Sequence, residues 1–168
     1  ETVSIEPETF YDYPESLRFF VLDGSKAENS MATDGKCLSF TLNDDGESYS
    51  VTDCGRLISG ELIIPSEFNG KPVTGIGEEA FYDCTYLTSV TIPERVTTIG
   101  NNAFNGCYAL TSVTIPDKVT KIGDFAFLNC ESLTKIDLNN VEIGNNAFDG
   151  CKSVTEINLD NCTIGIST

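Results

Sequence analysis

A unit of 23 residues repeats along the C-terminal half of the chain. Residues 76–98 read IGEEAFYDCTYLTSVTIPERVTT, and residues 99–121 read IGNNAFNGCYALTSVTIPDKVTK, which match at most positions. Two units of 21 residues follow, from Ile122 and from Ile143, and each lacks the proline of the longer units. A fixed period of this length predicts a stack of coils, because one unit cannot bury its own apolar edge without neighbours.

Apolar residues recur at the same places in every unit. Spacing of three and then two, as in Leu87, Val90 and Ile92, suits a bend that leads into a short strand whose alternate side chains point inward. We therefore expect a mostly β solenoid, of the α+β class once a short helix is counted, with one short strand per coil. The expected core columns are Phe81, Phe104, Phe127 and Phe148; Leu87, Leu110, Leu133 and Val154; Val90, Val113, Ile136 and Ile157; and Ile92, Ile115, Leu138 and Leu159.

A glycine follows the first isoleucine of every unit, for example at Gly100 and Gly123. Such a position requires either a positive φ or a close approach between neighbouring coils. The spacing of these glycines does not match a nucleotide-binding fingerprint.

Residues 37–54 alternate between apolar and polar side chains around Asp45-Gly46, which is a strong hairpin signal. A two-residue turn would pair Asp44 with Glu47 and would place Phe40 opposite Val51. We expect this hairpin to cap the N-terminal end of the solenoid, and residues 61–75 to form a degenerate first coil.

A short helix is expected before the hairpin. Ser25 is a candidate N-cap with Glu28 three residues later, and Gly35 follows the expected end. The chain then divides into 1–35, the end of a preceding degenerate repeat plus a capping helix; 36–75, the hairpin cap and first coil; and 76–168, four repeats and a closing strand. Alternatively, residues 1–35 are an irregular N-terminal cap of a single domain.

Seven cysteines are present, and four of them, Cys84, Cys107, Cys130 and Cys151, share one column of the repeat. Stacked side chains that point the same way are poorly placed for disulfides, so we interpret these and Cys162 as small buried apolar residues. Cys37 and Cys54 lie opposite each other in the expected hairpin register. A cross-strand disulfide between them is therefore expected in an oxidising location. Clustered zinc-type spacings are absent from the sequence, so no metal site is expected.

Charge and composition narrow the classes of function. The formal net charge is −16, from 26 acidic and 10 basic residues, which disfavours nucleic acid and anionic membranes as partners. Histidine is absent, which removes the commonest general acid–base residue, and no nucleophile has a visible base. We therefore expect a protein that is not an enzyme and has no cofactor. Direct insertion into a membrane is not expected either, because no apolar run is long enough to span one.

Alternation along each expected strand predicts an outward face. If Val90 and Ile92 point inward, then Ser89 and Thr91 point outward, and the same count applies in every coil. Thr91 and Thr114 are explained equally well as solvent-exposed strand residues chosen for their high β-propensity. The charged residues, which vary from coil to coil, favour recognition of a partner. The expected binding face consists of Glu61, Ile63, Ser89, Thr91, Ser112, Thr114, Lys135, Asp137, Glu156 and Asn158.

The pattern IGxxAFxxCxxLTxVTIPxxVTxIG over residues 76–165 resembles the BspA-like class of leucine-rich repeats of bacterial surface proteins. The resemblance implies an extracellular or cell-surface location, with any signal peptide removed, and a role in adhesion or protein recognition. A protein partner, on a host or bacterial surface, is expected, with a polysaccharide as the alternative. A passive structural spacer within a larger surface protein is the alternative function.

Overall fold

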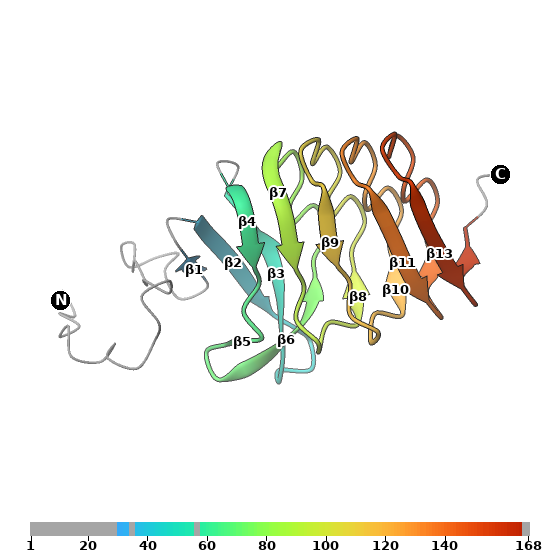
Figure 1. Ribbon diagram of the computed structural model, residues 1–168. Coiled ribbons are helices and arrows are strands. Elements are labelled where there is room, and N and C mark those ends of the chain that lie inside the picture. The colour runs from blue at the N-terminus through green and yellow to red at the C-terminus, as the bar shows by residue number, and fades with distance from the viewer. Residues whose placement is uncertain (1–29, 34–35, 56–57, 166–168) are drawn as a thin grey trace, which may run out of the picture.

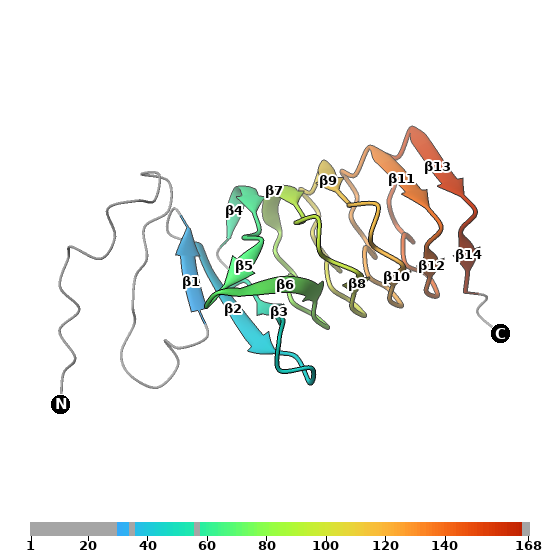
Figure 2. The ribbon, with the colours of Figure 1, turned by 90° about the horizontal axis from the view of Figure 1, so that it is seen from below.

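The computed structural model describes residues 30–33, 36–55 and 58–165, which form a β-solenoid of stacked coils (Figure 1). Two rows of strands run along the stack, and successive coils lie side by side from the N-terminal to the C-terminal end (Figure 2). The leucine-rich-type solenoid expected from the repeat is confirmed.

The first row of strands carries the expected SVTI-type segments. Its strands run parallel in two groups, one of three strands and one of two. We call the outward surface of this row the strand face; Figure 1 looks onto it. Its strands are β4 (Ser59–Ile63), β7 (Tyr86–Thr91) and β9 (Ser112–Thr114), then β11 (Lys135–Asn139) and β13 (Glu156–Asp160).

The prediction of one strand per coil is wrong, because most coils contribute a second strand to a second row. In each coil, the isoleucine of the Ile-Gly pair and the residue before it form a short strand. This strand pairs in parallel with its counterpart in the next coil, as in Thr98↔Lys121 and Ile99↔Ile122. Stacking of identical isoleucines and backbone pairing act together here. The row consists of β6 (Lys71–Ile76), β8 (Thr98–Ile99), β10 (Lys121–Ile122), β12 (Glu142–Ile143) and β14 (Thr163–Ile164), with β5 (Glu67–Phe68) antiparallel to β6.

The core lies between the two rows, and the predicted columns fill it. The Phe81, Phe104, Phe127 and Phe148 rings stack in one ladder, with centroids 4.8, 5.0 and 5.1 Å apart. The columns open at the C-terminal end, where Ile157 is 65% exposed while its counterpart Ile136 is 7% exposed. Each coil is therefore sealed by the coil that follows it.

The glycine of each Ile-Gly pair is explained by close approach between coils and not by positive φ. A Cβ added at Gly100 would lie 2.6 Å from the Glu78 nitrogen, and one at Gly123 would lie 2.6 Å from the Asn101 nitrogen. Backbone atoms cannot retreat from such a contact, so a larger side chain would separate the coils.

The hairpin of β2 (Lys36–Leu42) and β3 (Tyr49–Asp53) has the predicted register, with Phe40 opposite Val51 and Leu42 opposite Tyr49. Its turn differs from the prediction. Asn43 and Ser48 close a four-residue loop through the Asn43 N to Ser48 O bond of 2.8 Å, so Asp44 and Glu47 do not form a ladder pair. The Asp45 carboxylate accepts hydrogen bonds from the backbone nitrogens of Glu47 and Ser48, at 2.8 and 3.0 Å.

The expected helix and cap are not supported. Residues 30–33, within the segment expected to be helical, form β1 (Ser30–Thr33), which pairs antiparallel with β2; the start of that segment lies outside the described residues. Pairing with an open strand edge outweighs a local capping signal here. The hairpin also does not close the stack as a separate lid. It continues the second row edge to edge, because β3 pairs parallel with β6.

The expected Cys37–Cys54 disulfide is wrong, because Cys54 is bonded to Cys84. A register shift between Ser39 and Phe40 places Ser39 opposite Asp53, which leaves one extra residue on β3. Beyond such a bulge the side chains exchange faces. Cys54 therefore lies in the core, 3% exposed, and not on the polar face. Cys84 is also not the free thiol that its column suggested, whereas Cys107, Cys130, Cys151 and Cys162 are free.

Candidate binding face

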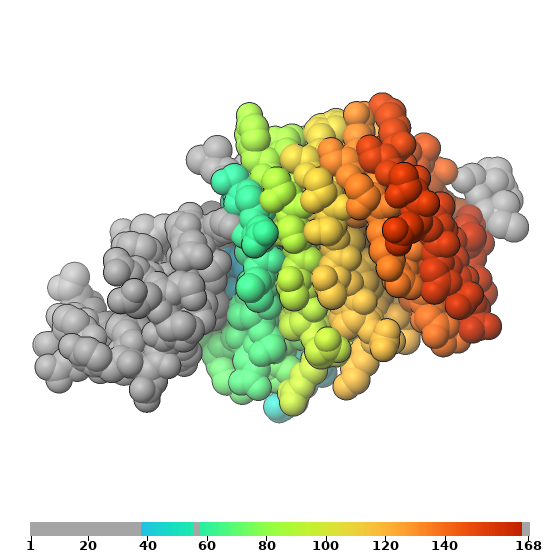
Figure 3. All heavy atoms as spheres, viewed as in Figure 1, coloured from blue at the N-terminus to red at the C-terminus, as the bar shows by residue number. Residues whose placement is uncertain are grey.

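All ten residues expected on the binding face lie on the strand face, and all are exposed except the half-buried Ser89. Figure 3 views the molecule onto this face. The expected columns form within each group of strands: Glu61 pairs with Ser89 and then Ser112, and Lys135 pairs with Glu156. The structure thus confirms that these side chains share one side of the solenoid; their role in binding stays a prediction.

The alternation of side chains suggested one continuous sheet, but the strand face is divided into two sheets. β9 pairs with β7 and β11 pairs with β13, but β9 and β11 do not pair with each other. The strand face therefore consists of an N-terminal patch, formed by Glu61, Ile63, Ser89, Thr91, Ser112 and Thr114, and a C-terminal patch, formed by Lys135, Asp137, Glu156 and Asn158.

The N-terminal patch is mostly neutral. Ser112 Oγ donates to Ser89 Oγ at 3.3 Å, which continues a column of small hydroxyl groups along neighbouring strands. Ile63 is 71% exposed at the edge of this patch, beside a shallow depression that Pro65 and Pro93 also line. Small hydroxyls and an exposed aliphatic side chain cost less to desolvate in contact with a partner than charged groups do.

The C-terminal patch is a network of charged groups. Lys135 Nζ lies 3.3 Å from an Asp137 oxygen and 3.7 Å from a Glu156 oxygen, and Asn158 Nδ2 donates to Asp137 Oδ1 at 3.0 Å. The hydrogen bond from Asn158, together with Lys135, lowers the pKa of the Asp137 carboxyl below its usual value. The Asp137 carboxyl therefore stays ionised to a lower pH than a free carboxyl group does.

A cleft of about 380 Å³ separates the two patches. The apolar side chains that line it come from the core columns, and six polar residues, including the hydroxyl-bearing Ser112 and Thr114, complete its walls. The apolar lining is Val113, Ile115, Leu133, Ile136, Leu138 and Phe148; the charged and amide lining is Asp117, Lys135, Asp137 and Asn139. Asp117 and the exposed parts of Val113 and Ile115 were not among the predicted site residues. The signal in the sequence was the loss of two residues between the second and third units.

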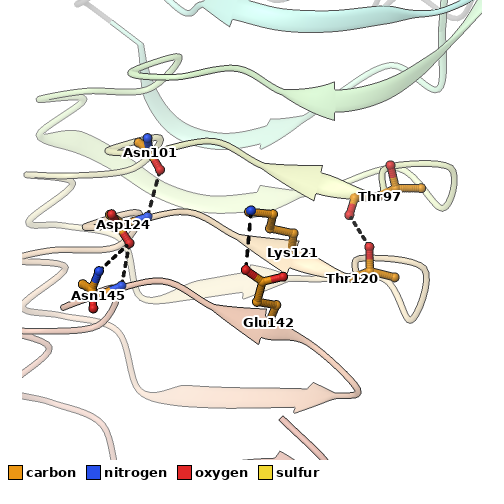
Figure 4. A network of polar contacts seen from close by, with 7 residues as sticks. All are labelled: Thr97, Asn101, Thr120, Lys121, Asp124, Glu142 and Asn145. Atoms are coloured by element: carbon orange, nitrogen blue, oxygen red, sulfur yellow. Dashed lines mark hydrogen bonds and ion pairs between the residues drawn. The ribbon is translucent and has the colours of Figure 1, made fainter. Parts of the chain in front are cut away.

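The opposite edge of the stack carries a different polar ladder (Figure 4). Asn101 Oδ1 accepts from the Asp124 nitrogen at 2.9 Å, and Asp124 Oδ1 accepts from the Asn145 nitrogen at 2.6 Å. Lys121 and Glu142 form an exposed ion pair of 3.5 Å between β10 and β12. Each contact joins one coil to the next, so we interpret this ladder as part of the stacking and not as a binding site.

Within the described ranges, no group of three or more His, Cys, Asp or Glu side chains could hold a metal ion. Burial raises the pKa of the Cys107 thiol to about 12, so this cysteine is unsuited to nucleophilic chemistry. The described residues contain no helix that is long and apolar enough to cross a membrane.

The profile of the BspA type leucine rich repeat region matches residues 62–168 in six copies. The match covers more than half of the chain, so the chain belongs to this family. The resemblance seen in the repeat pattern is thereby confirmed. The sequence matches no curated protein.

Solved structures of bacterial leucine-rich repeat proteins share the fold. A protein from Bacteroides capillosus is 27% identical with a TM-score of 0.62, over 77% of this chain and 96% of that one. A leucine rich cell surface protein from Faecalibacterium prausnitzii is 28% identical with a TM-score of 0.58, over 80% of this chain and 42% of that one. The T. pallidum leucine rich repeat protein, 23% identical with a TM-score of 0.59 over 76% of this chain and 83% of that one, supports the fold alone.

Proposed function

We propose that the strand face recognises a protein partner and that the chain is an adhesion or recognition module of a bacterial surface protein. The single observation that carries this proposal is the contrast between inward and outward residues. Along the same strands, the inward columns keep one kind of apolar side chain, while the outward positions change from hydroxyls at Ser89 and Ser112 to charges at Lys135 and Glu156. Packing does not require that change.

The location and partner class belong to the same proposal. Similarity to the cell surface protein from Faecalibacterium prausnitzii supports an extracellular or surface location, although this chain spans less than half of that protein. A parallel-strand face built from many coils offers an extended surface, which suits a large partner and many modest contacts. A protein on a host or bacterial surface fits such a face, and a polysaccharide is the outcome to be distinguished.

A capture experiment tests the proposal. The immobilised protein is incubated with host extracellular-matrix proteins and, separately, with bacterial wall material, and retained components are identified. The blocking variant Thr91→Arg with Asn158→Arg places one long side chain on each patch. The matched control Thr98→Arg with Thr163→Arg makes comparable changes at exposed positions of β8 and β14.

We expect the wild-type protein and the control to retain the same protein component, and the blocking variant to lose it. Equal retention by both variants would remove the strand face from the interaction. Retention of no component by the wild-type protein would favour the spacer. Loss of the retained material on polysaccharide digestion, but not on proteolysis, would favour a polysaccharide partner.

A further inference from the structure

The cleft between the two patches is fixed by the lengths of the coils that form it. Residues 116–121 separate Ile115 from Ile122, whereas only residues 139–142 separate the equivalent Leu138 and Ile143 one coil later. The two coils are joined at one end, where the Thr134 nitrogen donates to the Thr111 oxygen at 3.2 Å, and at the other, where β10 pairs with β12. Between these points the longer coil must diverge from the shorter one, so the strands separate there.

The separation leaves part of the core open to the strand face. Val113 and Ile115 are only partly buried, whereas their counterparts in the preceding coil, Val90 and Ile92, are 1% and 2% exposed. Burial of such apolar surface under a ligand removes it from water and therefore favours binding. The floor of the cleft therefore favours the apolar part of a side chain.

The rim of the cleft has an excess of negative charge. Asp117 comes from the longer coil and Asp137 from the shorter one. In the described part of the chain, the Asp117 carboxylate has no hydrogen-bond or ion-pair partner. Lys135, the cation of the rim, already contacts the carboxylates of both Asp137 and Glu156. Lys118, next to Asp117 in the sequence, does not line the cleft.

We propose that this cleft binds the side chain of an arginine or lysine from an extended, basic segment of the partner protein. The aliphatic stem would pack on Val113 and Ile115, and the cationic group would reach the carboxylates of Asp117 and Asp137. Arginine and lysine are the side chains that join an apolar stem to a permanent positive charge. A cleft of about 380 Å³ accommodates a side chain but not a folded element. This inference rests on the proposed function and specifies the chemistry of the partner.

A titration with single amino-acid derivatives tests the inference without the natural partner. The probes are the N-acetyl methylamides of arginine and lysine, with that of norleucine as the uncharged comparison of similar length. Methyl resonances of Val113 and Ile115 are followed by NMR in the intact protein. We expect saturable shifts at these methyl groups, with affinity for the arginine derivative up to about fivefold higher than for the norleucine derivative, since one solvent-accessible charge contact contributes no more than roughly that factor.

Two charge-reversal variants locate the contact. Asp117→Lys should weaken binding of the arginine derivative about tenfold, because it removes an attractive charge contact and places a like charge beside the ligand. Glu94→Lys makes the corresponding change at the equivalent position of the preceding coil and should leave the affinity unchanged. Both residues are exposed, so neither substitution should disturb folding.

The inference is overturned if the methyl groups show no saturable shift, if the norleucine derivative binds equally well, or if both reversals have the same effect. These results are distinguishable from failure of the proposed function. Capture of a protein through the strand face with a negative titration would mean that the face binds by other chemistry. A positive titration without any captured protein would support the cleft's preference for cations but would contradict the proposed recognition function.

Discussion

Cys54, which follows strand β3 of the N-terminal hairpin, is disulfide-bonded to Cys84 in the first complete coil, 30 residues further along the chain. The bond ties the hairpin to the repeat stack at the point where β3 and β6 already pair. It therefore joins two parts of the chain that otherwise meet through a short parallel ladder and apolar packing.

Reduction of this disulfide should destabilise the protein. A cross-link that closes a loop of 30 residues stabilises the folded state by about 3 to 4 kcal/mol, mainly by restricting the unfolded chain. We expect a reductant to lower the melting temperature of the wild-type protein but not that of the double variant Cys54→Ala with Cys84→Ala. A peptide map of the non-reduced protein that links Cys54 to a different cysteine would contradict the assignment.

The buried thiol of Cys107 should make stability decrease in alkaline solution. Burial raises its pKa to about 12, above the ordinary value near 9, so folding favours the protonated thiol. The stabilisation is complete below the unfolded pKa and is lost as the pH rises from about 9 towards 12, by at most about 1.4 kcal/mol per pH unit.

This prediction is checked by urea unfolding at several pH values between 8 and 11, with reductant present throughout. The free energy of unfolding of the wild-type protein should fall more steeply with pH than that of Cys107→Ala. Parallel curves for the two proteins would show that the Cys107 thiol is not the titrating group.

Truncation of the phenylalanine ladder should be costly at its centre. Phe104 is fully buried and stacks on both Phe81 and Phe127, so Phe104→Ala removes contacts from two interfaces at once. We expect a loss of about 3 to 5 kcal/mol in the free energy of unfolding. Thr114→Ala, at an exposed position of β9, should change it by no more than about 0.5 kcal/mol. Equal denaturation midpoints for these two variants would refute the core assignment.

The sequence predicted the repeat architecture because each apolar column recurs with a fixed period. Phe81, Phe104 and Phe127 occupy equivalent positions, and only stacking buries all three. The hairpin register was also predictable, because a turn of two residues and a loop of four residues both place Phe40 opposite Val51.

The features that were missed depend on contacts between segments or on geometry that accumulates along the chain. The bulge near Ser39 turns Cys54 into the core, and no local pattern signals it. Strand β1 forms because β2 offers an edge, whereas the Ser25 and Glu28 signal describes only local preference. The cleft at Val113 and Ile115 results from a difference in coil length, whose structural effect appears only when two coils are stacked.

The central claim is that the strand face recognises a protein, and its outward charges give the most direct test. Asp137 and Glu156 are exposed on the C-terminal patch, and surface ion pairs contribute only about 0 to 1 kcal/mol each. The double variant Asp137→Lys with Glu156→Lys should therefore fold with a nearly unchanged melting temperature. The matched control is Glu47→Lys with Glu78→Lys, two exposed glutamates outside the strand face.

The decisive measurement is the affinity of each variant for the protein captured by the wild-type chain, determined alongside its melting temperature. We predict that reversal of Asp137 and Glu156 weakens binding at least about tenfold, while the control binds like the wild-type protein. Unchanged affinity of the strand-face variant, with all three proteins equally stable, would contradict recognition through this face and would move the site to the loops.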